Sequence, residues 1–146
     1  MSDESDFKPI SLETMREVVK SSPFASWLGV RVAACRDGYA EVELDLRREM
    51  TQFHGYTHGA IVGGVADVAC AWAAASAVGE VVTAEYKVNF LSPAVGEKLV
   101  GRGYVIKASS RQVICRSDVL TVTGGQEKLV ATALATIVPV NRALNL

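Results

Sequence analysis

One stretch of this chain of 146 residues is apolar enough on every side to require burial. From Gly59 to Gly79 there is no proline, and nearly all the side chains are Ala, Val, Gly or Ile. A helix that is apolar all round its circumference belongs in a core or in a membrane. Asp67 carries the only formal charge of the stretch and lies near its middle, where a carboxylate disfavours membrane insertion. We therefore predict a central helix that is buried in a protein core.

The predicted burial makes Asp67 a candidate functional residue. Removing a carboxylate from water costs free energy unless hydrogen bonds, a partner charge or a catalytic task justify it. A structural Asp67 that is hydrogen-bonded in the core is the simplest alternative. Gln52 and the glycine at the start of the helix, Gly59, are close in sequence and favour a catalytic site instead.

Composition narrows the class of protein. The length fits one domain that can bury a sizeable core. The net charge is −1, with 15 Lys and Arg against 16 Asp and Glu and no basic cluster, so nucleic acid is not an expected partner. The three cysteines have no C-x-x-C spacing and predict neither a disulfide framework nor a metal site. The acidic N-terminus lacks the pattern of a signal peptide, and we expect a cytoplasmic protein with no membrane partner.

The chain is expected to consist of a polar leader over residues 1–10 and a single domain over residues 11–146. A first helix is predicted over residues 11–20, where Ser11 can act as the N-cap. The strands are predicted from alternating apolar residues and from turn signals such as Asp37-Gly38. They are expected at residues 30–35, 39–46, 81–90, 98–107, 112–123 and 128–138.

These elements predict an α+β domain. The first two strands form a hairpin, and short connections favour an antiparallel meander of the last four strands. Along residues 81–90, Val82, Tyr86 and Phe90 belong to one alternating set and Thr83 to the other, which is typical of a half-buried strand. A sheet that packs one face on one apolar helix gives this architecture, and the small side chains of the helix let a curved sheet wrap it closely.

With this order of elements, the chain resembles the hotdog-fold acyl-CoA thioesterases of the phenylacetic-acid-degradation and 4-hydroxybenzoyl-CoA thioesterase type. The resemblance runs from residues 24–29 (Phe-Ala-Ser-Trp-Leu-Gly) to residues 90–94 (Phe-Leu-Ser-Pro-Ala) and on into the last strand. It implies a hotdog fold, in which an antiparallel β-sheet wraps around one long central α-helix. In that family an Asn or Gln precedes the histidine of an H-G-G motif, an acid follows it, and a small hydroxyl lies on the next strand. The matching positions are Gln52, His58, Asp67 and Thr83.

Two positions depart from the usual family pattern. Ala60 stands where the second glycine of the H-G-G motif is common, and we expect it to be tolerated because that residue does not supply the credited N–H. Gln52 replaces the more frequent asparagine. The hydroxybenzoyl-CoA type includes branches with glutamine there, so activity is expected and the acyl preference stays open.

The residues at these positions suggest how thioester hydrolysis would proceed. Thioester hydrolysis passes through a tetrahedral oxyanion, which each preorganised donor stabilises by roughly 3 kcal/mol. The N–H of Gly59 would lie in the first turn of the central helix, where amides are unpaired and the helix dipole is positive. Asp67 would act either as the nucleophile or as a general base on water. Gln52 offers an amide donor, and Thr83 offers a hydroxyl that can orient a water molecule.

The helical spacing of Gly59 and Asp67 separates them within one chain. Eight residues correspond to about 12 Å along a helix axis and a rotation of about 80°. The two groups cannot meet at one carbonyl, so a shared site needs Asp67 of one chain and Gly59 of another. This agrees with the resemblance, which implies sheets that join edge to edge and active sites at the interface. We expect a homodimer or a dimer of dimers.

The remaining polar candidates have supporting roles. His58 is expected to order the loop before the helix through a backbone hydrogen bond, with direct catalysis as the alternative. The resemblance places His58 and Ala60 in the substrate-binding region. Arg111 and Lys87 are candidates for contacts with the phosphates of coenzyme A, although strand-surface charge also explains Lys87. No cofactor is expected, because coenzyme A is part of the substrate.

Two other functions stay open at this point. A hotdog dehydratase or hydratase also uses a histidine and an acid near the central helix, but the spacing of Gln52, Gly59 and Asp67 fits the thioesterase pattern better. A non-catalytic acyl-CoA sensor is the second alternative, since a fold alone does not confer activity. Aryl, medium-chain and long-chain acyl groups are all compatible with the sequence.

Overall fold

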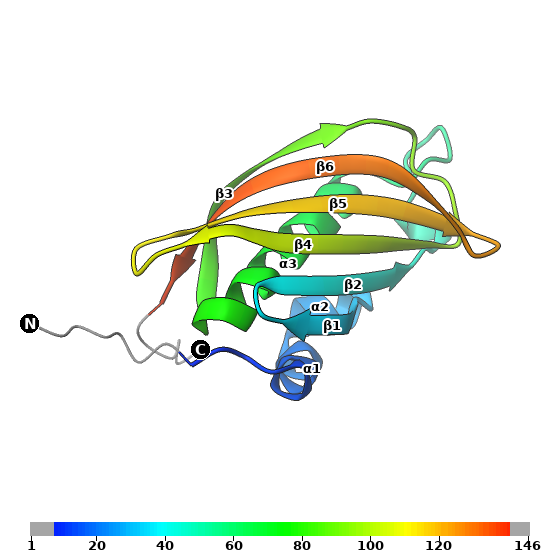
Figure 1. Cartoon of the computed structure of the whole chain (residues 1–146). Coiled ribbons are helices and arrows are strands. Elements are labelled where there is room, and N and C mark those ends of the chain that lie inside the picture. The colour runs from blue at the N-terminus through cyan, green and yellow to red at the C-terminus, as the bar shows by residue number, and fades with distance from the viewer. Residues whose placement is uncertain (1–7, 141–146) are drawn as a thin grey trace, which may run out of the picture.

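A curved antiparallel sheet of six strands wraps around one long helix, α3 (Gly59–Val78), in the computed structural model (Figure 1). This confirms the predicted α+β architecture. The structure describes residues 8–140. The other elements, in chain order, are α1 (Leu12–Ser21), α2 (Pro23–Leu28), β1 (Arg31–Arg36), β2 (Tyr39–Asp45), the 3-10 helix η1 (Arg48–Met50), β3 (Val81–Phe90), β4 (Lys98–Ala108), β5 (Val113–Thr123) and β6 (Gln126–Pro139).

Two short helices precede the sheet and lie beside its β1 edge (Figure 1). The predicted cap of α1 is confirmed, because Ser11 Oγ accepts a hydrogen bond from the N–H of Thr14 at 3.2 Å. Helix α2 is absent from the sequence prediction. It begins with Pro23 in its first turn, and it ends at Gly29, whose φ of 84° lies in the left-handed region.

The leader predicted over residues 1–10 falls partly outside the described residues, which begin at residue 8. Within the described part, Ile10 packs against the hydrophobic core, and its N–H donates to the carbonyl of Ala75 at 3.0 Å. Ile10 thereby joins the segment before α1 to the central helix.

The strand order is β1-β2-β4-β5-β6-β3, so the predicted meander of four consecutive strands is wrong. Only β4, β5 and β6 form a meander. Strand β3 pairs with β6 along its whole length, from Val81 opposite Pro139 to Phe90 opposite Ala131, and β4 pairs with β2. Strand order depends on contacts between distant segments, which local hydrophobic alternation does not report. As a result, β3 is an edge strand.

The sheet approaches α3 most closely along β4, at two glycines. A Cβ atom built on Gly103 would lie 2.0 Å from the carbonyl oxygen of Ala69, and one on Gly101 would lie 2.8 Å from Val65 Cγ1. Small residues on both the helix and the strand therefore set the spacing of the two layers. Helix α3 has the length and hydropathy of a membrane span, but 61% of that window is buried inside the protein. It is the core helix of the domain.

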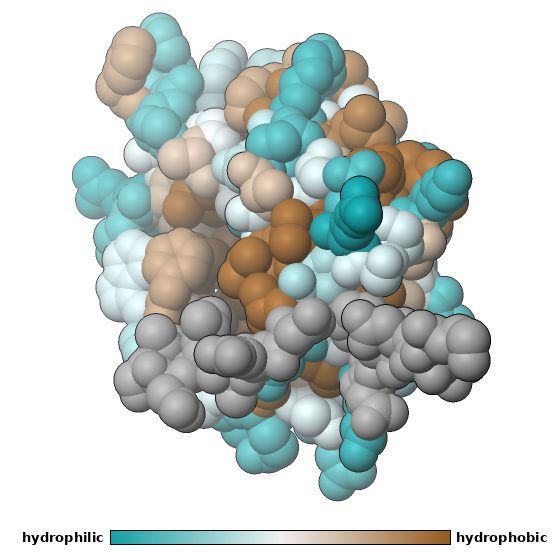
Figure 2. Space-filling model, turned by 90° about the vertical axis from the view of Figure 1, so that its left-hand side faces the viewer, coloured by the Kyte–Doolittle hydropathy of each residue, from teal (hydrophilic) through white to brown (hydrophobic). Residues whose placement is uncertain are grey.

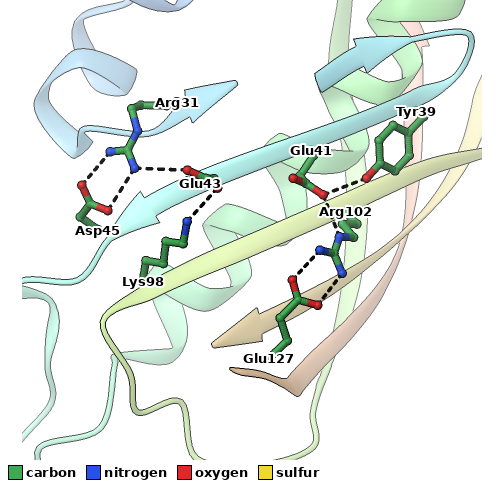
Figure 3. A network of polar contacts seen from close by, with 8 residues as sticks. All are labelled: Arg31, Tyr39, Glu41, Glu43, Asp45, Lys98, Arg102 and Glu127. Carbon is green, nitrogen blue, oxygen red and sulfur yellow. Dashed lines mark hydrogen bonds and ion pairs between the residues drawn. The ribbon is translucent and has the colours of Figure 1, made fainter. Parts of the chain in front are cut away.

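The outer face of the sheet carries a network of ion pairs (Figure 3). Glu43 lies between Lys98 at 2.9 Å and Arg31 at 3.5 Å. Arg102 binds both Glu41 and Glu127, with N–O distances of 2.8 and 2.6 Å. Charged side chains thus cover the face of β1, β2 and β4 that points away from α3.

The surface at the end of the molecule that holds the β4–β5 hairpin has both apolar and hydrophilic side chains. Figure 2 shows apolar patches between hydrophilic side chains on this side. Val82 at the start of β3 and Ile106 near the end of β4 are exposed apolar residues.

Candidate active site

The start of α3 presents an amide that has no acceptor in the described residues 8–140. His58 is the N-cap, and its Nδ1 accepts the N–H of Ala60 at 3.0 Å. The carbonyl of His58 accepts the N–H of Ile61 at 2.9 Å. The N–H of Gly59 donates to no group in this part of the chain. The structure thus agrees with the prediction that His58 hydrogen-bonds backbone, and it leaves the Gly59 amide available to a ligand.

Gln52 lies in a tight turn that precedes this helix. Its N–H donates to the carbonyl of Tyr56 at 2.9 Å, and its own carbonyl accepts the N–H of Gly55 at 2.9 Å. The side-chain oxygen of Gln52 accepts the backbone N–H of His54. This arrangement fixes the orientation of the amide and leaves its NH₂ group without an acceptor among residues 8–140. The side-chain amide of Gln52 can therefore donate a hydrogen bond to a ligand from a defined orientation.

Gln52 and Gly59 line the same open pocket, which has a volume of about 370 Å³. The pocket lies where the turn, the start of α3 and the segment after β3 meet. Its remaining lining residues are Tyr56, Thr57, Val62, Phe90, Leu91, Ser92, Pro93 and Ala94. Thr57 ties two of these segments together, because its N–H donates to the carbonyl of Ala94 at 2.9 Å.

Asp67 and Thr83 form a second group, two helical turns further along α3. The hydroxyl of Thr83 donates to Oδ1 of Asp67 at 2.7 Å. A β-bulge between Thr83 and Glu85 makes this contact possible. Simple alternation would place Thr83 and Tyr86 on opposite faces, and the extra residue turns Thr83 toward the helix.

Burial raises the pKa of Asp67 above its usual range, and the hydrogen bond from Thr83 lowers it in part. No cationic side chain among residues 8–140 forms an ion pair with Asp67. A part-buried carboxylate without a cationic partner suits a base or a nucleophile, because its charge is not neutralised. No group of His, Cys, Asp or Glu side chains in residues 8–140 could hold a metal ion, and the absence of a cofactor stays a prediction.

A single chain therefore contains two separate halves of the predicted site. One half holds Gln52 and Gly59, while Asp67 and Thr83 do not line that pocket. Arg111 lies in the β4–β5 turn, outside the pocket, with its N–H 3.4 Å from Ser109 Oγ. Lys87 is exposed on β3 and donates to Asn89 at 2.6 Å. The chain by itself brings neither cation to the Gly59 amide.

Comparison with known proteins identifies the family. The model of the thioesterase superfamily matches residues 54–128, which is more than half of the chain. The chain belongs to the thioesterase superfamily. This matched segment contains Gly59, Asp67 and Thr83, while Gln52 lies just before it.

Similar solved structures and curated relatives agree with this family. A thioesterase family protein of Silicibacter pomeroyi is 34% identical, with a TM-score of 0.80 over 84% of this chain and 93% of that one. A variant of the phenylacetic acid degradation protein PaaI of Thermus thermophilus is 28% identical, with a TM-score of 0.72 over 82% and 100% of the two chains. A Saccharolobus solfataricus protein, named provisionally as an esterase, is 26% identical over 93% of this chain and 90% of its own. Membership of the thioesterase superfamily makes this protein an acyl-thioester hydrolase in general terms.

Sequence reasoning missed the apolar residues of the pocket in this superfamily member. Phe90 and Tyr56 were not selected as site residues, because an aromatic at a strand end or in a loop is usually explained by packing. The available signals were that Phe90 belongs to the alternating set of Val82 and Tyr86 and that residues 90–94 are part of the family resemblance.

Proposed function

We propose that this protein hydrolyses acyl-CoA thioesters as a homodimer, at sites shared between two chains. The Gly59 N–H of one chain binds the developing oxyanion, and Asp67 of the other chain supplies the carboxylate. The observation that carries the proposal is a free amide and an unneutralised carboxylate, two helical turns apart on α3. The Gly59 amide has no acceptor among residues 8–140, and Asp67 has no cationic partner there.

The edge strand β3 supports a homodimer. In residues 8–140 it pairs only with β6, so its other edge offers free backbone N–H and C=O groups. Val82, Tyr86 and Phe90 on this strand are 41%, 41% and 56% exposed. A long edge strand with exposed apolar side chains is a template for pairing with a second copy. Pairing of two β3 strands would bring α3 of each chain toward the partner and place Asp67 of the partner subunit near Gly59.

The proposed reaction begins with the thioester carbonyl oxygen at the Gly59 N–H, with a second donor from the amide of Gln52. Asp67 then either attacks the carbonyl carbon or removes a proton from an attacking water molecule. In the first route the C–S bond breaks as a mixed anhydride forms, and water hydrolyses the anhydride. In the second route water adds directly and the C–S bond breaks from the tetrahedral intermediate. Both routes consume one water and yield the free acid and the coenzyme A thiol.

Thr83 has a positioning role in this proposal. Its hydroxyl proton is directed at Asp67, which fixes the carboxylate and favours its charged form. The oxygen of Thr83 still has lone pairs with which to accept a hydrogen bond from the attacking water. The cytoplasmic location and the pairing of dimers into tetramers stay predictions from the sequence.

Thiol release from a panel of acyl-CoA substrates tests the proposal. The panel contains acetyl-, octanoyl-, hexadecanoyl-, phenylacetyl- and hydroxybenzoyl-CoA, with crotonyl-CoA to detect hydration of a double bond. We expect release of coenzyme A from at least one saturated or aryl substrate and no such release by Asp67→Asn. Binding of the panel without turnover would support a sensor instead, and hydration of crotonyl-CoA without hydrolysis would support a hydratase.

A further inference from the structure

Phe90 is in contact with the backbone that carries the proposed oxyanion donor. It is the last residue of β3, and its ring points at the start of α3. The ring atom Cζ lies 3.2 Å from the position that a Cβ of Gly59 would occupy, with Cε1 and Cε2 at 3.6 and 3.7 Å. The tip of the ring thus rests against the one residue of the helix start that has no side chain.

The glycines of α3 permit a row of such contacts. Four residues further along, the Tyr86 hydroxyl lies 3.5 Å from the corresponding position on Gly63. Four residues beyond that, Thr83 meets Asp67. Strand β3 therefore runs along one side of α3, and Phe90 occupies the end of this row at the pocket.

The same ring is a wall of the pocket that holds Gln52 and Gly59. Most of the other lining residues in the segment after β3 are apolar, including Leu91, Pro93 and Ala94. A volume of about 370 Å³ lies at the small end of ligand pockets, which span about 300 to 1,000 Å³.

We propose that Phe90 is a specificity-determining residue that limits the size of the acyl group. The ring forms one wall of the pocket beside Gly59 and disfavours acyl groups that extend past it. This inference rests on the proposed function, because it assumes that the thioester carbonyl binds at Gly59. Phe90 acts by steric exclusion, and it takes no part in bond making.

The physical basis is the position of the ring against the start of α3. A longer acyl chain would have to displace the ring from its contact with the helix start or leave its end in water. A single methylene that fails to fit an apolar pocket changes specificity by about tenfold or more. Removal of the ring would open the pocket at this wall, while a larger ring would shorten it.

A graded substitution series tests the proposal. The ratio of kcat/KM for hexadecanoyl-CoA to that for octanoyl-CoA is measured in the wild type and in Phe90→Leu, Phe90→Ala, Phe90→Tyr and Phe90→Trp. We expect a low ratio in the wild type, a rise through Leu to at least about tenfold in Ala, and little change in Tyr. Phe90→Trp should instead lower kcat/KM for octanoyl-CoA relative to butyryl-CoA. The oligomeric state of each variant is checked by native mass spectrometry.

Phe53→Ala is the matched control, because Phe53 is 92% exposed in the neighbouring turn and does not line the pocket. It should leave every ratio unchanged. The inference is overturned if the wild type hydrolyses hexadecanoyl-CoA as well as octanoyl-CoA. It is also overturned if Phe90→Ala slows all substrates equally, since the ring would then only shield Gly59 from water. If Phe90→Ala does not fold, Phe90→Trp tests the inference instead. An unchanged kcat/KM for octanoyl-CoA relative to butyryl-CoA in that variant would overturn it.

Failure of the proposed function is a separate outcome. The same series is measured by calorimetric titration of the acyl-CoAs, which reports the size preference without turnover. Binding that discriminates by size through Phe90, without hydrolysis of any substrate, would support the size limit and contradict the hydrolase proposal. Binding with no dependence on Phe90 would overturn the size limit whether or not hydrolysis occurs.

Discussion

The hydroxyl of Thr83 donates a hydrogen bond of 2.7 Å to the carboxylate of Asp67, across the junction between β3 and α3. The bulge after Thr83 directs this side chain toward the helix. The contact gives the part-buried acid of the core helix a single neutral partner. It therefore fixes the position of the carboxylate and leaves its charge available for chemistry.

The pH dependence of activity should report this contact. Burial raises the pKa of Asp67, and the Thr83 hydroxyl lowers it in part, so Thr83→Val should raise the pKa of Asp67 further. Because the charged carboxylate is the active form, the acidic limb of the kcat/KM profile should move to higher pH. Thr83→Ser keeps the hydroxyl and should leave the limb in place. If the acidic limb stays at the same pH in Thr83→Val, the limb does not report the titration of Asp67.

Asp67→Asn should abolish hydrolysis and stabilise the fold. The amide is nearly isosteric but is neither a base nor a nucleophile, so we expect a loss of roughly three orders of magnitude in kcat. The folded-state pKa of Asp67 is raised, so its charge destabilises the folded state at pH 7, and this penalty is relieved as the pH falls through that pKa. Thermal unfolding should show a higher Tm for the variant at pH 7 and a smaller difference below pH 3.8, the ordinary pKa of the group. Normal turnover in the folded variant would remove Asp67 from the mechanism.

Gly103 should not tolerate a methyl group. Its Cβ would lie 2.0 Å from the carbonyl oxygen of Ala69, which is backbone and cannot move without shifting α3. Gly103→Ala should therefore lower the free energy of unfolding by about 3 kcal/mol or prevent folding. Gly64→Ala adds the same group to α3 with no atom within 4 Å, and it should change stability by at most about 1 kcal/mol. Equal stability of Gly103→Ala and the wild type in urea denaturation would contradict the close packing of β4 on α3.

The ion-pair network on the outer face should stabilise the fold only above acidic pH. A hydrogen bond from Lys98 is the main cause that lowers the pKa of Glu43, with Arg31 as a weaker one. A lowered pKa means that the stabilisation is present above the ordinary value of 4.5 and is lost as the pH falls through the folded-state pKa. Glu43→Gln should cost up to about 1 kcal/mol at pH 7 and progressively less below pH 4.5. The exposed Glu17, paired with Lys20 on α1, is the control, and its Gln variant should have no measurable effect at either pH.

The parts of the fold that depend on local pattern were predictable from the sequence. The central helix begins at Gly59 as expected, and the hairpin turns at Asp37 and Gly38, whose φ values of 47° and 80° suit a tight β-turn. The edge position of β3 was not predictable, because hydrophobic alternation is the same whichever strand is its neighbour.

The site was predictable only in part, for a related reason. The spacing of Gly59 and Asp67 already showed that one helix cannot bring them together, and the structure places them in separate halves. The bulge that turns Thr83 toward Asp67 left no mark in the alternation of β3. The contact of Phe90 with Gly59 joins two segments that are 31 positions apart, and no local pattern reports it.

The proposed shared site is tested most directly by mixing two inactive variants. Asp67→Asn removes the carboxylate. Gly59→Pro removes the N–H at the first helical position, where the backbone accepts proline, and its Cβ requires a small shift of the Phe90 ring, which lies 3.2 Å away. Heterodimers of the two contain one site with both defects and one site with neither. Random pairing of equal amounts makes half of the dimers heterodimers, each with one intact site, so activity should return to roughly a quarter of the wild-type value.

Subunit exchange is confirmed by native mass spectrometry before the rate is measured. Mixtures of wild type with Gly59→Pro show whether the proline damages more than the donor, because each heterodimer should then keep one working site. The account predicts that hydrolysis reappears on mixing Asp67→Asn with Gly59→Pro. Exchanged heterodimers that stay inactive, while the wild-type mixture keeps its expected activity, would contradict a site built from Gly59 of one chain and Asp67 of the other.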